Sequence, residues 1–472
     1  MTTPAIDARP SMKTLQAYRF ALDPTPSQER ALWAHAGAAR VAHNWALARV
    51  KAVVEQRAAE RSYGIAESAL TPTSSWSLPA LRREWNTNKS VVAPWWRTCS
   101  KEAFNTGLDA LARALKNWSD SRTGSRRGRA MGFPRFKSRR RDTPSVRFTT
   151  GAIRLESDRQ HVVLPKLGQL KVHESTRKLA RRIDAGTARI LSATVRRVGG
   201  RWYVAFTVEV VRDVSHPRRP NAVVGVDVGI TCLAVLSTGE GVPNPRHLDR
   251  ALRQVRSLSR RLARQSGPAG RPRRQPSRRW LRTKAKLSRL HARVANRRID
   301  GLHKLTTRLA DEFGTIVVED LHVTGMLGNR RVARHIADAG FGEIRRQLQY
   351  KTRWNGGRLV VADRWYPSSK TCSSCGVVRT KLLLSDRKFH CDECGAVHDR
   401  DLNAARNLAA LAARIDTTGS GPEAGRGADQ KTHFGGRVAA KRQSGTAAAG
   451  KTGTAAPQGV ATNAALTFSA ER

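Results

Sequence analysis

The chain has 472 residues, more than one hydrophobic core usually organises, so several folded units are expected. It contains 86 Lys and Arg against 37 Asp and Glu, and this net charge of +49 is spread along the whole sequence. The surplus indicates a long nucleic acid as partner rather than a membrane surface, with a ribosomal or histone-like binder as the simplest alternative. An apolar run of about eighteen residues does not occur, which excludes a membrane-spanning helix and predicts a soluble, cytoplasmic protein.

The first half of the chain predicts a strand-rich unit that is interrupted by helices. Residues 13–26 contain an alternating strand pattern, and residues 142–214 contain further segments rich in β-branched and aromatic residues. Between them, residues 27–141 have apolar positions three and four apart, which is typical of helices. We expect the two strand-rich parts to form one sheet or barrel with the helical unit inserted. Residues 1–12 are predicted to be a disordered leader.

The helical insert ends in a basic loop. Its first helix is predicted over Ser27–Val53, and broken helices follow from about Ser75 to Ser121. The next twenty residues are basic and glycine-rich and include the segment GFPRFKS, with Phe133 and Phe136. Two interpretations are open: a loop that tracks phosphates and stacks bases on these rings, or a solvated linker whose phenylalanines are anchored in the core.

Residues 221–411 have a different pattern. Buried-strand patterns occur at Val223–Ser237, Gly314–Asp320 and Arg358–Asp363, and a helix is predicted over Phe341–Trp354. Residues 246–312 predict an arginine-rich helical hairpin, interrupted by a mobile Arg/Pro/Gly-rich segment at 267–279. Residues 415–472 are rich in Gly, Ala and Thr and are predicted to be a disordered tail.

Three acidic residues stand at strands or at a helix start. Asp227 lies in a buried-strand pattern, where an unpaired carboxylate costs several kcal/mol, so a divalent metal or an arginine must accompany it. Glu319 ends a second such strand, and its neighbour Asp320 is the alternative ligand there. Asp401 precedes a helix and is either an N-cap or a ligand, while Asp399 could cap the helix equally well. If Asp227, Glu319 and Asp401 converge, they could hold two Mg²⁺ ions for phosphodiester cleavage.

Four cysteines form two Cys-x-x-Cys pairs within a predicted zinc ribbon at residues 370–396: Cys372, Cys375, Cys391 and Cys394. Their spacing fits a structural Zn²⁺ site, with Gly376 and Gly395 relieving the tight turn after each pair. A redox pair is the alternative, but it needs only one such motif and explains neither the doubling nor the glycines. Cys99 and Cys232 stand alone and are expected to be small core residues.

Taken together, these segments resemble one protein family. VVGVDVGITCLAVLSTGE, VVEDLHVTGM, YPSSKTCSSCG, CDECG and HDRDLNAARN resemble TnpB, the transposon-encoded RNA-guided nuclease related to compact type V CRISPR effectors. AYRFALDPTPSQ, ARVAHNWAL, GFPRFKS and VLPKLGQLKV are similar to that family as well. The resemblance extends from about Leu15 to Ala410.

The resemblance implies an α+β multidomain fold. It consists of a wedge-type β-barrel (13–26 and 142–214) with an inserted helical recognition unit (27–141), then an RNase H-like, RuvC-type α/β nuclease domain (221–411) with an inserted zinc ribbon. It also implies that Asp227, Glu319 and Asp401 are the catalytic, magnesium-binding triad. Asp401 is chosen over Asp399 because it stands two residues before the family's asparagine, here Asn403.

The function implied by the resemblance is a Mg²⁺-dependent, RNA-guided DNA endonuclease of a mobile element, which cleaves target DNA next to a short adjacent motif. Its expected cofactors are structural Zn²⁺, catalytic Mg²⁺ and a guide RNA, and its expected partners are target DNA and a transposase from the same element. We expect it in the prokaryotic cytoplasm, associated with the nucleoid. The alternatives are a catalytically silent RNA-guided or zinc-ribbon DNA-binding protein and an accessory transposase.

Overall fold

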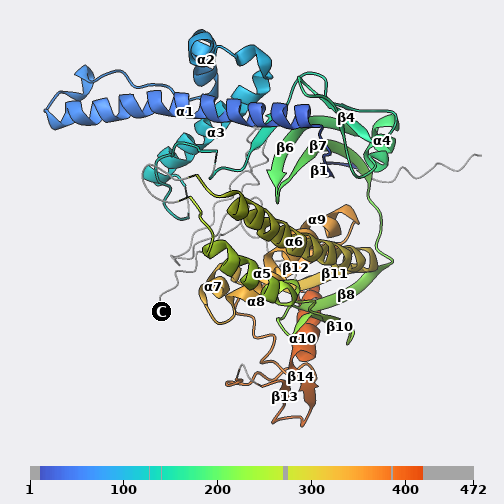
Figure 1. The fold of residues 1–472 in the computed structure, drawn as a ribbon. Coiled ribbons are helices and arrows are strands. Elements are labelled where there is room, and N and C mark those ends of the chain that lie inside the picture. Colours follow the sequence, from blue (N-terminus) through green and yellow to red (C-terminus); the bar gives the residue numbers. More distant parts are fainter. Residues whose placement is uncertain (1–10, 127, 140, 269–274, 384–385, 418–472) are drawn as a thin grey trace, which may run out of the picture.

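The computed structural model describes residues 11–126, 128–139, 141–268, 275–383 and 386–417 (Figure 1). The fold is a mixed α+β architecture, as predicted, with an N-terminal and a C-terminal sheet region. Within the described ranges, no helix combines the length and the apolar character needed to cross a membrane. Most of the predicted leader and tail and the centre of the predicted mobile segment lie outside the described residues.

The N-terminal region contains two antiparallel sheets joined at one edge. Their orders are β1-β7-β6-β2 and β3-β4-β5. The strands are β1 (Ser11–Ala21), β2 (Ser145–Phe148), β3 (Arg154–Leu155), β4 (His161–Leu164), β5 (Gly168–Lys171), β6 (Ala188–Val198) and β7 (Arg201–Asp213). A bridge between Leu22 and Val172 links the two sheets, but no pairing among the described strands closes them. The strands of the predicted wedge-type β-barrel therefore form two open sheets here, since among the described strands β2 pairs with β6 alone and β3 with β4 alone.

Three helices follow β1: α1 (Pro26–Ser62), α2 (Leu78–Val92) and α3 (Lys101–Arg122). Helices α1 and α3 pack against β2, α2 packs on α1 and α3, and α4 (Arg177–Asp184) packs near β6 (Figure 1). Short 3₁₀ turns lie at Glu67–Ala69 and Trp96–Thr98. Helix α1 continues nine residues beyond the predicted end at Val53, and Arg57 and Arg61 in this extension bind Glu67. Gly107 lets α3 approach α1 closely, since a Cβ there would overlap the backbone of Ala39.

The C-terminal sheet has five strands in the order β10-β9-β8-β11-β12. Its strands are β8 (Arg219–Asp227), β9 (Cys232–Leu236), β10 (Gly241–Pro243), β11 (Phe313–Glu319) and β12 (Arg358–Ala362). Strands β8, β11 and β12 run parallel, and β9 and β10 are antiparallel additions at one edge. The buried runs of Val and Ile in the parallel strands are typical of a sheet that is covered on both faces.

Helices cover both faces of this sheet (Figure 1). They are α5 (His247–Ala263), α6 (Arg278–Glu312), α7 (Val323–Gly328), α8 (Ala333–Ala339), α9 (Phe341–Trp354) and α10 (Arg400–Thr417). On one face, Leu305 of α6 and Ile344 of α9 pack in the same core as Ile316. On the other face, Leu408 of α10 packs against Val317. Strands β13 (Lys388–His390) and β14 (Val397–Asp399) form a small hairpin that projects beyond α10.

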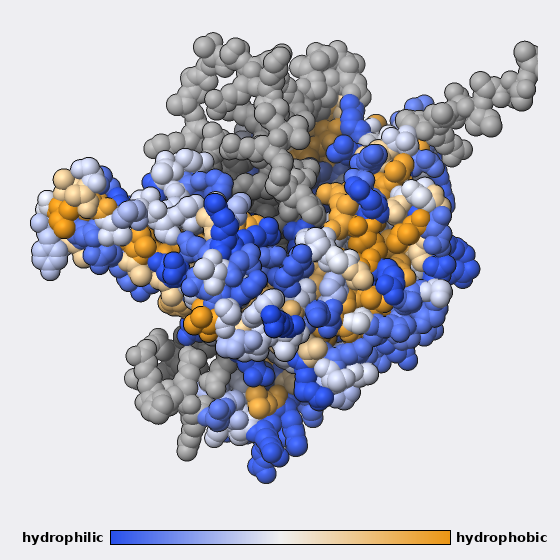
Figure 2. All heavy atoms as spheres, turned by 90° about the horizontal axis from the view of Figure 1, so that it is seen from above, coloured by the Kyte–Doolittle hydropathy of each residue, from blue (hydrophilic) through white to orange (hydrophobic). Residues whose placement is uncertain are grey.

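Hydrophilic residues predominate on much of the face seen in Figure 2, with apolar residues gathered mainly over one side. Helices α5 and α6 form the predicted arginine-rich pair, and α5 carries exposed arginines, among them Arg253, Arg256, Arg260 and Arg261, with Arg264 following at its C-cap. A buried carboxylate secures this pair to the sheet region. Asp338 accepts a 2.9 Å hydrogen bond from Arg298 of α6 and a 2.7 Å bond from the backbone N–H of Leu248 in α5.

Candidate active site

Asp227 and Glu319 lie at the carboxyl ends of two neighbouring parallel strands. Val226 of β8 is in register with Val318 of β11, so the residue that follows each of them stands at the same level. Adjacent strands are about 4.8 Å apart, which brings the two acids side by side. In open α/β sheets this edge is where ligands bind, because the connecting loops leave it accessible.

Helix α10 brings the third acid to the same edge. Gly225 lies two residues before Asp227, and a Cβ on it would overlap the carbonyl oxygen of Ala405 and lie 2.6 Å from the backbone nitrogen of Ala409. The backbone of helix α10 therefore lies directly against the backbone of β8 at Gly225. The first turn of the helix is directed toward the end of the strand. Asp401 lies in that first turn.

The electrostatics of Asp227 report how close the acids are. The pKa of Asp227 is raised to about 8, first by burial and then by the negative charges of Glu319 and Asp401, against a lowering effect of Arg400. Among the described residues, only the four cysteines bring three or more potential metal-binding atoms within 4.8 Å of one another, so the oxygens of the three acids do not all lie that close together. A wider spacing suits a site for two ions about 4 Å apart, because carboxylates that share two ions surround more space than one ion needs.

Asp320 has a different role from its neighbour. Its carboxylate accepts hydrogen bonds from Arg345 and, at 2.7 Å, from Nη2 of Arg364. Burial raises the pKa of Asp320, but these two guanidinium groups overcome that effect and hold the pKa below its usual value. The alternative in which Asp320 is the ligand is therefore disfavoured, because both of its oxygens already have cationic partners.

Asp399 is the N-cap of α10. One oxygen of its carboxylate accepts hydrogen bonds of 3.0 Å from the backbone N–H groups of Asp401 and Leu402. These groups lie at the helix start, where backbone donors have no partner within the helix. The capping role that the sequence left open between Asp399 and Asp401 thus belongs to Asp399.

Ser368 and Asn407 support the site and escaped the sequence analysis. The buried Oγ of Ser368 donates a hydrogen bond to Oε1 of Glu319. The side-chain amide of Asn407, on α10, donates to the backbone oxygens of Ser368 at 2.7 Å and Thr371 at 2.6 Å. Helix α10 and Glu319 are thereby joined through one short segment of chain.

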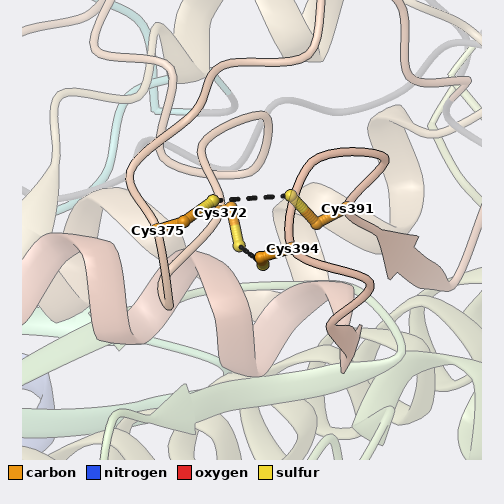
Figure 3. Close-up of side chains that lie close together, drawn as sticks. All are labelled: Cys372, Cys375, Cys391 and Cys394. Atoms are coloured by element: carbon orange, nitrogen blue, oxygen red, sulfur yellow. Dashed lines mark hydrogen bonds between the residues drawn. The ribbon is translucent and has the colours of Figure 1, made fainter.

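The four cysteines gather at two matching turns (Figure 3). Cys372 Sγ lies 3.7 Å from Cys394 Sγ, and Cys375 Sγ lies 3.5 Å from Cys391 Sγ. A disulfide would place two sulfurs about 2.0 Å apart, whereas four thiolates around one zinc at 2.3 Å are separated by about 3.8 Å. All four are free thiols, and the spacing fits a single tetrahedral metal site.

Each cysteine turn is built in the same way. The N–H of Gly376 donates to the oxygen of Cys372, and the N–H of Gly395 donates to the oxygen of Cys391, at 2.9 and 3.0 Å. Both glycines have positive φ, +82° and +70°, which only glycine adopts at little cost. Asn403 of α10 accepts a 2.9 Å bond from the N–H of Ser373, so the first turn is attached to the helix that carries Asp401.

Outside this site, the structure separates the two phenylalanines of the basic loop. Phe133 makes an edge contact with Trp118 at 4.9 Å and belongs to the core, whereas Phe136 is 54% exposed. The loop is held by Asn44, whose side chain pairs with both the N–H and the C=O of Lys137. The core interpretation is thus supported for Phe133, and the stacking interpretation of Phe136 stays a prediction. The predicted core role of Cys99 is confirmed, and Cys232 is half-buried.

Three family descriptions match parts of the chain. Residues 12–58 match a helix-turn-helix domain of the OrfB/IS605 type, residues 205–330 match a probable transposase of that type, and residues 341–408 match the Cas12f1-like TNB domain. The first match covers strand β1 and most of helix α1 in the structure.

Relatives match along almost the whole chain. Rv2885c of Mycobacterium tuberculosis is 43% identical over 452 residues, covering 90% of this chain and 94% of the relative. A Streptomyces pristinaespiralis protein is 35% identical, covering 86% and 91%. InsQ of Escherichia coli is 31% identical, covering 88% and 96%. The chain belongs to the TnpB family.

Proposed function

We propose that this chain is a Mg²⁺-dependent, RNA-guided DNA endonuclease of a mobile element that cleaves target DNA next to a short adjacent motif. The observation that carries the proposal is the convergence of Asp227, Glu319 and Asp401 at one sheet edge, with the pKa of Asp227 raised to about 8. The names of the three relatives describe RNA-guided DNA endonucleases, which supports the same activity.

The three acids fit magnesium by their chemistry, since oxygen ligands suit that ion. Bound there, Mg²⁺ supplies Lewis-acid stabilisation and a water of lowered pKa. Ser368 holds one oxygen of Glu319, so the second oxygen would be available to the ion. Asp227, kept from ionising by burial and its neighbours, gains most from a cation because its charge then has a partner. Asp401 is carried into place by the capped start of α10.

The surrounding architecture is assigned by the same proposal. The sheet β10-β9-β8-β11-β12 with its helices is an RNase H-like, RuvC-type domain, and the two N-terminal sheets with helices α1–α3 are a wedge and recognition unit. The four cysteines hold a structural Zn²⁺, supported by the sulfur spacings of 3.5 and 3.7 Å. The ribbon then stabilises the segment between the second and third acids.

Guide RNA and target DNA are the partners that the charge supports. The net charge of +49 needs a long polyanion for its neutralisation. The exposed arginines of α5 are part of that positive charge. A guide paired with its target delivers sequence specificity by base pairing, so the protein needs few base contacts of its own beyond the adjacent motif.

The purified full-length protein tests the proposal directly. We expect one discrete RNA to copurify, and we expect the complex to cut matching DNA only when Mg²⁺ is present. Asp227→Ala should abolish cutting while RNA retention stays unchanged. Asp320→Asn, at the acid assigned a structural role, serves as the neighbouring control and should retain cutting. Binding without any cutting favours the silent binder, and joined DNA ends favour the accessory transposase.

A further inference from the structure

The loop of residues 363–368 lies against the acidic edge and is attached to β11 at two points. Arg364 binds Asp320 with Nη2 to Oδ2 at 2.7 Å and with Nε to the backbone oxygen at 3.3 Å. Ser368 donates to Glu319, the neighbour of Asp320 in sequence. Both attachments are to residues at the carboxyl end of β11, so the loop has little freedom to move away from the acids.

Hydrogen bonds inside the loop fix its shape as well. The N–H of Trp365 donates to Oδ1 of Asp363 at 2.8 Å, and the N–H of Tyr366 donates to the backbone oxygen of Asp363 at 3.1 Å. The hydroxyl of Tyr366 donates to the backbone oxygen of Asn407 at 3.1 Å. Tyr366 is partly buried by this contact, whereas Trp365 beside it is 84% exposed. A rigid loop thus presents an indole ring to solvent.

The backbone of Trp365 lies near that of Glu319. Ala362, the last residue of β12, is in register with Glu319, and Trp365 follows it by three residues. One strand spacing of about 4.8 Å and three residues of chain place the two Cα atoms within roughly 15 Å of each other. Two cationic side chains, Arg345 and Arg364, lie at this end of β11, where both bind the carboxylate of Asp320.

We propose that Trp365 is a stacking platform for an unpaired base of the DNA strand that enters the acidic site. An exposed aromatic face beside cationic groups is the combination that holds single strands without reading their sequence. With one base stacked on Trp365, the backbone of the same DNA strand would cross the three acids a few nucleotides farther along. The inference rests on the proposed function, because it requires a strand to be cut there.

The experiment uses the full-length protein with its copurified RNA and single-stranded DNA carrying 2-aminopurine near the cleaved bond. Trp365→Ala is compared with Trp365→Phe, which keeps an aromatic face. The control is Tyr63→Ala, since Tyr63 is 85% exposed at the end of α1, on the N-terminal helical unit. The measurements are KM and kcat for cleavage, and 2-aminopurine quenching without Mg²⁺.

We expect Trp365→Ala to raise KM about tenfold and to abolish the quenching, with kcat changed much less. Trp365→Phe and Tyr63→Ala should remain close to the wild type. Unchanged KM and quenching in Trp365→Ala, in an enzyme that cuts normally, would overturn the inference and leave the proposed function standing. Lost RNA retention with unchanged DNA quenching would overturn it too, by placing the ring on the guide. A wild-type complex that quenches but never cuts would instead contradict the proposed function.

Discussion

The carboxylate of Asp399 accepts hydrogen bonds from the backbone N–H groups of Asp401 and Leu402, each at 3.0 Å. Two acids that are two residues apart therefore do different work. Asp399 stabilises the start of α10, and Asp401 is left to contribute its charge to the edge where Asp227 and Glu319 lie. The two positions can be separated by mutation, because one acts on stability and the other on chemistry.

Asp399→Ala should lower the free energy of unfolding by about 1 kcal/mol, the usual effect of losing an N-cap, and should reduce cleavage only in part. Asp401→Asn should leave the unfolding midpoint close to that of the wild type and abolish cleavage. Thermal melts and a Mg²⁺-dependent cleavage assay on both variants make the comparison. The assignment is contradicted if Asp399→Ala abolishes cleavage at full stability, or if Asp401→Asn still cuts.

The raised pKa of Asp227 predicts a pH dependence of stability in the absence of Mg²⁺. The group binds a proton in the folded state up to about pH 8, whereas in the unfolded chain it loses that proton near its ordinary pKa of 3.8. Folding therefore takes up a proton between these values, and this group's contribution to stability falls as pH rises through that window. Asp227→Asn removes the contribution.

Urea unfolding midpoints at pH 5 and pH 8, in buffer without Mg²⁺ or chelator, test this dependence. From pH 5 to pH 8, the urea midpoint of the wild type should decrease more than that of Asp227→Asn. Added Mg²⁺ should reverse the fall in the wild type alone, because the cation favours the ionised carboxylate. Parallel midpoints for the two proteins at both pH values would show that Asp227 titrates normally in the fold.

Ser368→Ala should weaken the response to magnesium. The hydroxyl of Ser368 orients Glu319, and loss of a hydrogen bond to a metal-binding carboxylate typically reduces metal affinity by 10- to 100-fold. We expect the Mg²⁺ concentration for half-maximal cleavage to rise by at least about tenfold. Metal binding by calorimetry should weaken in parallel, which separates this effect from one on the chemical step.

The matched control for Ser368 is Ser369→Ala, at the next residue, which is less buried. Both variants lose one hydroxyl group, so any general effect of the substitution is shared. If the two variants respond equally to Mg²⁺, the contact between Ser368 and Glu319 has no role in positioning the acid.

The strands and acids were predictable because their signals are local. Runs of Val and Ile predict buried strands, and the places where those runs end predict where Asp227 and Glu319 lie relative to the sheet. Helix α1 continues past Val53 because Arg57 and Arg61 bind Glu67 on the following turn, and such ion pairs leave no apolar periodicity to detect. The four-residue strand β5 also lacks a clear sequence pattern, since only Leu170 among its residues is buried.

The supporting residues could not be predicted from local patterns. Ser368 and Glu319 are 49 residues apart in sequence, and Asn407 and Ser368 are 39 apart. Polar residues are most often exposed, so nothing local indicates that these two are buried and hydrogen-bonded. The choice between Asp399 and Asp401 as cap also depended on coordinates, because both precede the helix and both can accept the bonds of an N-cap.

Gly225→Ala should separate α10 from the sheet. The new Cβ would overlap the carbonyl oxygen of Ala405 and lie 2.6 Å from the nitrogen of Ala409, and backbone atoms in a packed helix cannot move aside locally. Overpacking of this kind costs about 1–3 kcal/mol. Because α10 carries Asp401, we expect cleavage to fall more than the loss of stability alone explains.

The control is Gly241→Ala in β10 of the same sheet, where an added Cβ meets no atom within 4 Å. It should change the free energy of unfolding by no more than about a few tenths of a kcal/mol. The cleavage rate should stay the same. Cleavage by Gly225→Ala is best measured below its melting temperature, so that lost activity reflects a displaced helix rather than an unfolded chain. Wild-type activity in folded Gly225→Ala would mean that α10 does not need close contact with β8 to place Asp401, because the helix would then have moved without cost to the site.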